Sequence, residues 1–154
     1  MNATFLLGGL AAALLFSSLG CGSAALDPAS EAGKLEAART KWSVSGVRSY
    51  RFTLTRSAFI APGYSGPAKI TVTDGVVTKV EPAGENEIVP GAFDSCDTIE
   101  ELFARAQGGI ETDGAIVSGT YDLETGVPKT ISVDPFPRAA DDEVAYIVSD
   151  FKAF

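Results

Sequence analysis

The sequence contains no histidine and only two cysteines, and these absences exclude several classes of chemistry. Without histidine, the chain lacks both the most common general base and the most common zinc ligand. Nucleophiles that are activated by a neighbouring imidazole are excluded as well. Cys21 and Cys96 are too few to form a thiolate metal cage. We therefore expect a protein that is not an enzyme and that carries no cofactor.

Positive charge is also scarce. The 154 residues include 12 Lys and Arg against 20 Asp and Glu, which gives a net charge of −8 at pH 7. A chain this acidic repels a phosphate backbone, and the sequence shows none of the basic stretches that nucleic-acid-binding proteins carry. We therefore expect no nucleic acid among its partners.

Charge of either sign is missing from the start of the chain, where the first charged side chain is Asp27. A largely apolar run extends from Phe5 to Leu19. Its length is typical of the hydrophobic region of an export signal and is below the roughly 20 apolar residues of a membrane-spanning helix. The residues before it contain no Lys or Arg, whereas export signals normally carry positive charge there.

Three interpretations of this leader remain open. In the one that we favour, the sequence Ser18-Leu19-Gly20-Cys21 makes Cys21 the lipid-attachment site of a bacterial lipoprotein. Gly20 and Cys21 fit the usual motif of Leu, a small residue, Gly or Ala, and Cys, whereas Ser18 and Leu19 fit it poorly. In the second, cleavage after Ala25 releases a soluble periplasmic or secreted domain. In the third, the leader is retained as an uncleaved anchor.

The lipoprotein interpretation divides the chain into a signal peptide over residues 1–20, a tether over residues 21–27 and a single domain over residues 28–154. It places the protein in the cell envelope, lipid-anchored to the outer membrane or the cell surface. Two or more acyl chains hold a protein on a membrane much more firmly than one chain does. The expected partners are the membrane, through the lipid, and an envelope protein.

The hydrophobic pattern predicts two helices in the domain. The first has Asp27 as its N-cap and Pro28 at its first helical position, and it ends at Gly46. The spacing of its apolar residues predicts one buried stripe, formed by Leu35, Ala38 and Trp42. The second helix lies within residues 96–109, with Asp97 as its cap, Glu100 in a variant of the capping box, and Gly108-Gly109 at its end.

Alternating and β-branched segments predict the strands. One strand lies within residues 49–60, a hairpin over residues 69–80 turns at Asp74-Gly75, a second hairpin covers residues 115–134, and a last strand covers residues 143–151. We therefore expect an α+β fold with a mostly antiparallel sheet of about five strands. The N-terminal helix and the one mid-chain helix should pack on one face of this sheet.

The densest acidic segment is Asp141-Asp142-Glu143, which precedes the last strand, and Asp122 lies in the neighbouring hairpin. Oxygen ligands of this kind are the ones that Ca²⁺ prefers, although no EF-hand spacing is present. These four residues are candidate metal ligands, and they support an alternative function as a Ca²⁺-dependent module or a weak hydrolase. That alternative requires the carboxylates of Asp122 and of Asp141 to Glu143 to converge in one concavity.

Six short motifs occur in a characteristic order along the domain. They are Trp42, Tyr50-Arg51-Phe52, Ile70 to Gly75, Thr98 to Phe103, Tyr121-Asp122 with Gly126-Val127-Pro128, and Asp141-Asp142-Glu143. In this order the chain resembles a family of small bacterial secreted or lipoprotein-type domains, numbered 6174 in the domain-of-unknown-function series. The resemblance spans about Trp42 to Phe151 and implies no assigned activity. We expect an envelope lipoprotein that serves as a non-enzymatic binding or accessory module.

Overall fold

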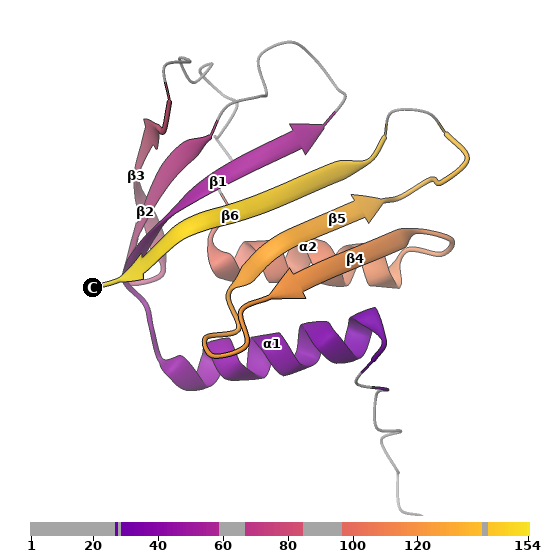
Figure 1. The fold of residues 1–154 in the computed structure, drawn as a ribbon, viewed down its shortest axis with the longest axis horizontal. Helices are drawn as coiled ribbons and strands as arrows, with labels where there is room; N and C mark the ends of the chain where they lie inside the picture. The colour runs from indigo at the N-terminus through magenta and orange to yellow at the C-terminus, as the bar shows by residue number, and fades with distance from the viewer. Residues whose placement is uncertain (1–26, 28, 59–66, 85–96, 140–141) are drawn as a thin grey trace, which may run out of the picture.

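One six-stranded antiparallel sheet and two helices make up the part of the chain that the computed structural model describes, residues 27, 29–58, 67–84, 97–139 and 142–154 (Figure 1). The elements in chain order are α1 (Glu31–Ser45), β1 (Tyr50–Ala58), β2 (Ala68–Thr73), β3 (Val76–Pro82), α2 (Ile99–Glu111), β4 (Ile116–Tyr121), β5 (Pro128–Asp134) and β6 (Val144–Ala153). The predicted α+β class is confirmed, with six strands where about five were expected. Neither described helix has the length and hydropathy that crossing a membrane requires.

The strand order across the sheet is β3-β2-β1-β6-β5-β4. The two predicted hairpins form its two sides, as β2 with β3 and β4 with β5. The centre is the pair of β1 and β6, the first and last strands of the chain, which lie side by side in Figure 1. The two sides of the sheet are therefore joined only when β6 pairs with β1. This central pairing connects the two strands that are farthest apart in the sequence.

Both helices lie against one face of the sheet, as predicted (Figure 1). Helix α2 packs on β4 and β5, while α1 packs on β4 and α2. The core lies between this helix layer and the sheet and includes the predicted stripe of Leu35, Ala38 and Trp42. On the opposite face, the described residues include no helix, and we call this side of the sheet the open face.

An aromatic and carboxylate cluster joins α1, α2 and the central strands. The ring of Trp42 makes edge contacts with Tyr50 and Phe151. The Glu100 carboxylate accepts hydrogen bonds from Trp42 Nε1 and from the Tyr50 hydroxyl, each at 2.9 Å. Burial, the main cause, raises the pKa of Tyr50 above its usual value, and the negative charge of Glu100 also raises it. The Glu100 carboxylate thus fixes the positions of two buried aromatic side chains, Trp42 of α1 and Tyr50 of β1, between the helix layer and the sheet.

The start of α2 lies one residue later than the sequence predicts. Its N-cap is Thr98, whose hydroxyl accepts a hydrogen bond from the backbone N–H of Glu101, and the Glu101 carboxylate accepts one from the N–H of Thr98. Asp97 is buried instead and receives two hydrogen bonds from Arg105. The predicted cap was wrong because two adjacent residues, each three positions before a glutamate, satisfy the same capping pattern.

The predicted end of α2 was also wrong, since the helix continues through Gly109 to Glu111. A Cβ atom at Gly109 would lie 2.7 Å from a methyl carbon of Val117 and 2.9 Å from one of Val133. This glycine therefore allows the helix to approach the sheet closely and does not terminate it.

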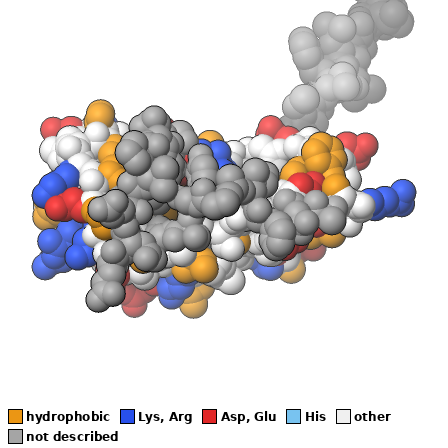
Figure 2. All heavy atoms as spheres, turned by 90° about the horizontal axis from the view of Figure 1, so that it is seen from above, with side chains coloured by type: hydrophobic (Ala, Val, Ile, Leu, Met, Phe, Trp, Pro, Cys, Tyr) orange, Lys and Arg blue, Asp and Glu red, His pale blue; other side chains and the backbone are white. Residues whose placement is uncertain are grey.

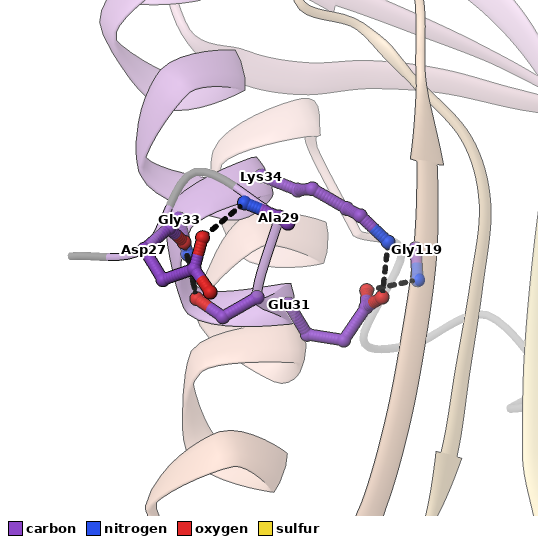
Figure 3. Close-up of polar contacts among 7 residues, drawn as sticks. Asp27, Ala29, Glu31, Gly33, Lys34 and Gly119 are labelled. Carbon is purple, nitrogen blue, oxygen red and sulfur yellow. Dashed lines mark hydrogen bonds and ion pairs between the residues drawn. The ribbon is translucent and has the colours of Figure 1, made fainter.

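The start of α1 is displaced in the same direction as that of α2. Ser30 is its N-cap, and the Ser30 hydroxyl accepts a hydrogen bond from the N–H of Gly33. Asp27, the predicted cap, instead accepts a hydrogen bond from the N–H of Ala29 in the preceding turn, and Pro28 lies outside the described residues (Figure 3). The serine lies closer to the first buried residues of the helix, so its hydroxyl is the one that reaches the free N–H groups.

The first turn of α1 is joined to the edge of the sheet through Glu31. Its carboxylate accepts a hydrogen bond from the N–H of Gly119 in β4, at 2.9 Å, and pairs with Lys34 at 2.6 Å (Figure 3). Strand β4 is an edge strand, and an edge N–H without a partner would be open to pairing with another chain. Glu31 thus satisfies one edge donor and fixes α1 beside β4.

Candidate functional site

The open face of the sheet is formed by the alternate residues of β1 and their neighbours. Tyr50, Phe52 and Leu54 point into the core, so Arg51 and Thr53 point to the open face. The register continues this face across the sheet: Arg51 lies opposite Thr71 in β2 and opposite Lys152 in β6. The predicted alternation of β1 side chains between two faces is therefore confirmed, but of Arg51 and Thr53 only Arg51 is exposed, because Thr53 is buried on the open face at 7% exposure.

A hollow of about 680 Å³ lies on this face, where β1, β2, β3 and β6 adjoin. Its size is in the range of small-molecule sites. The charged and hydroxyl side chains that line it are Arg51, Thr53, Lys69, Thr71, Glu81, Asp150 and Lys152. Lys and Arg side chains gather at the end of the molecule where Figure 1 places the C-terminus, with acidic side chains beside them (Figure 2). The hollow is thus polar and combines charges of both signs.

Three cations of the hollow form no ion pair with another residue in the described part of the chain. Glu81 pairs with Lys79 at 2.9 Å, which leaves Arg51, Lys69 and Lys152 without a hydrogen bond or ion pair to any described residue. Arg51 and Lys152 lie directly opposite each other. Like charges in that position repel and destabilise a sheet. The hollow therefore holds three cations without an ion pair to a described residue, together with two carboxylates, Asp150 and Glu81, the latter directly opposite Lys69.

A β-bulge in β6 forms one wall of the hollow. The register between β1 and β6 shifts between Arg51 and Thr53, and Asp150 has a φ of 53°. That left-handed conformation is uncommon for a residue other than glycine, although aspartate tolerates it better than most. The Oδ2 atom of Asp150 accepts hydrogen bonds from the hydroxyls of Thr53 and Ser149. The bulge thus directs a carboxylate beside the cations.

Asp122, a candidate metal ligand from the sequence, has a structural role in the β4–β5 turn. Its Oδ1 atom accepts hydrogen bonds from the N–H groups of Glu124 and Thr125 and from the Thr125 hydroxyl. These bonds, together with Lys129, hold the pKa of Asp122 well below its usual range. The carboxylate is therefore engaged in closing its own turn.

The other candidate ligands lie at the opposite end of β5. Tyr121, just before Asp122, pairs with Pro128 at one end of the strand, and Val133 pairs with Val144, just after Glu143, at the other end. Seven residues of strand span about 20 Å. The structure thus does not bring Asp122 together with Asp142 and Glu143, and Asp141 lies outside the described residues. Within the described ranges, no group of three or more His, Cys, Asp and Glu side chains is placed to hold a metal ion.

Cys21, the predicted lipid-attachment site, and Ala25, the alternative cleavage site, also lie outside the described residues. The structure therefore tests neither lipid attachment at Cys21 nor cleavage after Ala25.

The hollow was not predicted from the sequence, although one signal was present. The alternation in β1 and the Asp74-Gly75 hairpin place Arg51 and Lys69 on the exposed face. The third cation, Lys152, joins them only through the pairing of β1 with β6, which no local pattern specifies. A search for exposed cations on predicted neighbouring strands would have found two of the three.

Comparison with known proteins identifies one family. The model of a family of unknown function, DUF6174, matches residues 34–153. Neither the curated proteins nor the solved structures contain a match to this chain. The match covers α1 from Lys34 onward, the whole of α2 and all six strands, and so includes the residues that line the hollow.

Proposed function

The chain belongs to the DUF6174 family, whose function is unknown, and we propose that it is a non-enzymatic binding module of the cell envelope. In this proposal a lipid on Cys21 anchors the domain, and the open face of the sheet binds the partner. The observation that carries the proposal is the hollow, in which Arg51, Lys69 and Lys152 form no ion pair with a described residue, on an otherwise acidic protein.

The chemistry of the described residues supports binding more than catalysis. The sequence has no histidine, and Asp97, Glu100 and Asp122 are each occupied by two or more hydrogen bonds inside the fold. A general base must be free to reach its substrate. The hollow instead offers charged groups on a rigid sheet, which is an arrangement suited to holding a ligand.

The position of the first helix is compatible with a tether. The described domain begins at the first turn of α1, which lies in the helix layer beside β4 (Figure 1). The open face is the opposite side of the sheet. A partner can therefore approach this face from the side away from the point where residues 21–27 join the domain.

The proposed location, lipid-anchored in the cell envelope, is tested by intact-mass measurement of the chain purified from the membrane fraction. A mature N-terminus at Cys21 with the added mass of a diacylglycerol supports the proposal. A mature N-terminus at Leu26 would reject the lipid anchor and would support the alternative, a soluble periplasmic or secreted domain. Replacement of Cys21 by Ser (C21S) provides the control, because it should abolish the lipid mass and the recovery in the membrane fraction.

The binding face is tested by photo-crosslinking in the native envelope from two exposed positions. Ile147 is 44% exposed and pairs with Thr55 and Thr130 on the open face, whereas Leu123 is 82% exposed in the turn beside α1. We expect one discrete crosslinked product from a benzophenone residue at position 147 and none from position 123. Equal products at both positions, or a product at position 123 alone, would reject the open face as the binding surface.

A further inference from the structure

The arrangement of charges in the hollow indicates an anionic ligand. Lys152 lies directly opposite Arg51, and Lys69 is the diagonal neighbour of Arg51, since Lys69 pairs with Thr53. Side chains so placed on one face of a sheet lie within reach of a single bound group. Lys69 lies directly opposite Glu81, so the repulsion that a bound anion would relieve is chiefly the one between Arg51 and Lys152.

The charge and the donors favour phosphate over carboxylate. A phosphate monoester carries a charge of about −1.5 to −2 at pH 7, which balances more of the three cations than a carboxylate does. The guanidinium of Arg51 can donate two parallel hydrogen bonds to phosphate oxygens. Thr71, directly opposite Arg51, adds a hydroxyl that donates no hydrogen bond to another described residue. The hollow therefore supplies several donors for one multiply charged group.

Asp150 indicates what is attached to that phosphate. Both of its hydrogen bonds within the described structure go to Oδ2, which leaves Oδ1 to accept one from a ligand. A carboxylate repels phosphate but binds a neutral hydroxyl group well. The 680 Å³ of the hollow exceeds the space that a phosphate alone requires, since a water molecule occupies about 30 Å³. The ligand thus has room for a hydroxylated substituent.

We propose that the hollow binds a polyol phosphate, with the phosphate on Arg51, Lys69 and Lys152 and a hydroxyl on Asp150. The proposal rests on the proposed function of the open face as a binding surface and names the ligand chemistry. Two sources supply a phosphate attached to a polyol: a free monoester such as glycerol phosphate, and the headgroup of an anionic phospholipid such as phosphatidylglycerol, which is a diester with a single negative charge. The charge argument favours the monoester, while both sources offer phosphate oxygens to Arg51 and a hydroxyl to Asp150.

Calorimetric titration of the purified mature chain with glycerol 3-phosphate tests the phosphate site. We expect saturable binding that weakens about tenfold or more in the Arg51→Ser variant. Arg39 is an exposed cation of α1, so Arg39→Ser removes the same charge outside the hollow and should leave the affinity unchanged. No heat with the wild-type chain at about 10 mM ligand, or equal weakening by both variants, would overturn the proposal. Lys152→Ser supplies a second test should Arg51→Ser fail to fold, as judged by its circular dichroism.

Asp150→Asn tests the hydroxyl contact, and asparagine also tolerates the left-handed backbone at this position. We expect the variant to reduce the preference for glycerol 3-phosphate over inorganic phosphate. An unchanged preference would reject the polyol part of the proposal.

Sedimentation with phosphatidylglycerol vesicles, compared with phosphatidylcholine vesicles, identifies the source of the ligand. Sedimentation that depends on Arg51 supports the lipid headgroup. Absence of sedimentation, together with binding of the soluble ester, supports the free ligand. Crosslinking from position 147 succeeds or fails independently of these results, so the two proposals are separable.

Discussion

Replacement of Gly126 by alanine should displace α1 from the β4–β5 turn. Gly126 has a φ of 78°, and a Cβ atom there would meet the backbone oxygen of Ala38 and lie 3.0 Å from the backbone nitrogen of Trp42. The left-handed conformation costs a residue with a Cβ about 1–2 kcal/mol. Crowding against a packed backbone adds about 1–3 kcal/mol. We therefore expect G126A to lower the free energy of unfolding by about 2–5 kcal/mol.

Gly114 provides the matched control for this substitution. Its φ is 79°, but the described structure has nothing within 4 Å of a Cβ atom at this position. G114A should therefore pay the backbone cost alone, about 1–2 kcal/mol. Urea unfolding followed by circular dichroism measures both free energies by linear extrapolation. The difference between the two variants isolates the contact between the turn and α1.

The fluorescence of Trp42 gives a second readout. It is the one tryptophan of the sequence and is 5% exposed at the contact with Gly126. A shift of α1 in folded G126A should move its emission to longer wavelength, while G114A should leave the emission unchanged. Equal destabilisation of the two variants, within about 0.5 kcal/mol, would refute the argument that the close approach of the backbones requires glycine.

Three further predictions follow from polar groups in the fold. The folded pKa of Asp122 is lowered, so the stability that its carboxylate contributes is present above the unfolded pKa of about 4 and is lost as the pH falls below it. Urea unfolding at several pH values should therefore show that D122N loses less stability in acid than the wild type does. Burial raises the pKa of Tyr121 to about 12, so the stability that its neutral hydroxyl contributes is present below a pH of about 10 and is lost as the pH rises to 12. A Y121F variant should therefore lose less stability in alkali than the wild type, and an identical alkaline profile would contradict this. The buried Asp97 receives two hydrogen bonds from Arg105, so D97N should lower the free energy of unfolding in urea by about 1–3 kcal/mol. The control D113N, at an exposed position, should lower it by less than about 0.5 kcal/mol. Equal losses in the two variants would count against a structural role for the ion pair.

The sequence predicts those parts of the fold that local patterns specify. The alternation of Tyr50 with Arg51 and the turn at Asp74-Gly75 depend on neighbouring residues, and the structure confirms both. The cap of α2 was missed by one residue because Asp97 and Thr98 are both good caps, and only the burial of Asp97 against Arg105 decides between them. Tertiary contacts thus resolve what the local pattern leaves equivalent.

The candidate site was harder to predict because a bulge changes the phase of β6. Simple alternation from Tyr146 and Val148 would direct residue 152 toward the core. The extra residue at Asp150 shifts the pattern by one position, so Phe151 packs against Trp42 and Lys152 pairs with Arg51 on the open face. Neither the bulge nor its strand partner is encoded in a local motif, and both are needed to assemble the three cations.

The hydrogen bond from Gly119 to Glu31 also determines how a pulling force enters the domain. Force on the chain before residue 27 reaches the first turn of α1, and Glu31 passes part of it directly to β4. The helix therefore cannot unwind from its N-terminal end without first breaking a contact with the sheet. For a domain pulled by its N-terminus, the Glu31 carboxylate is therefore a contact with the sheet that the force loads in the first turn of α1.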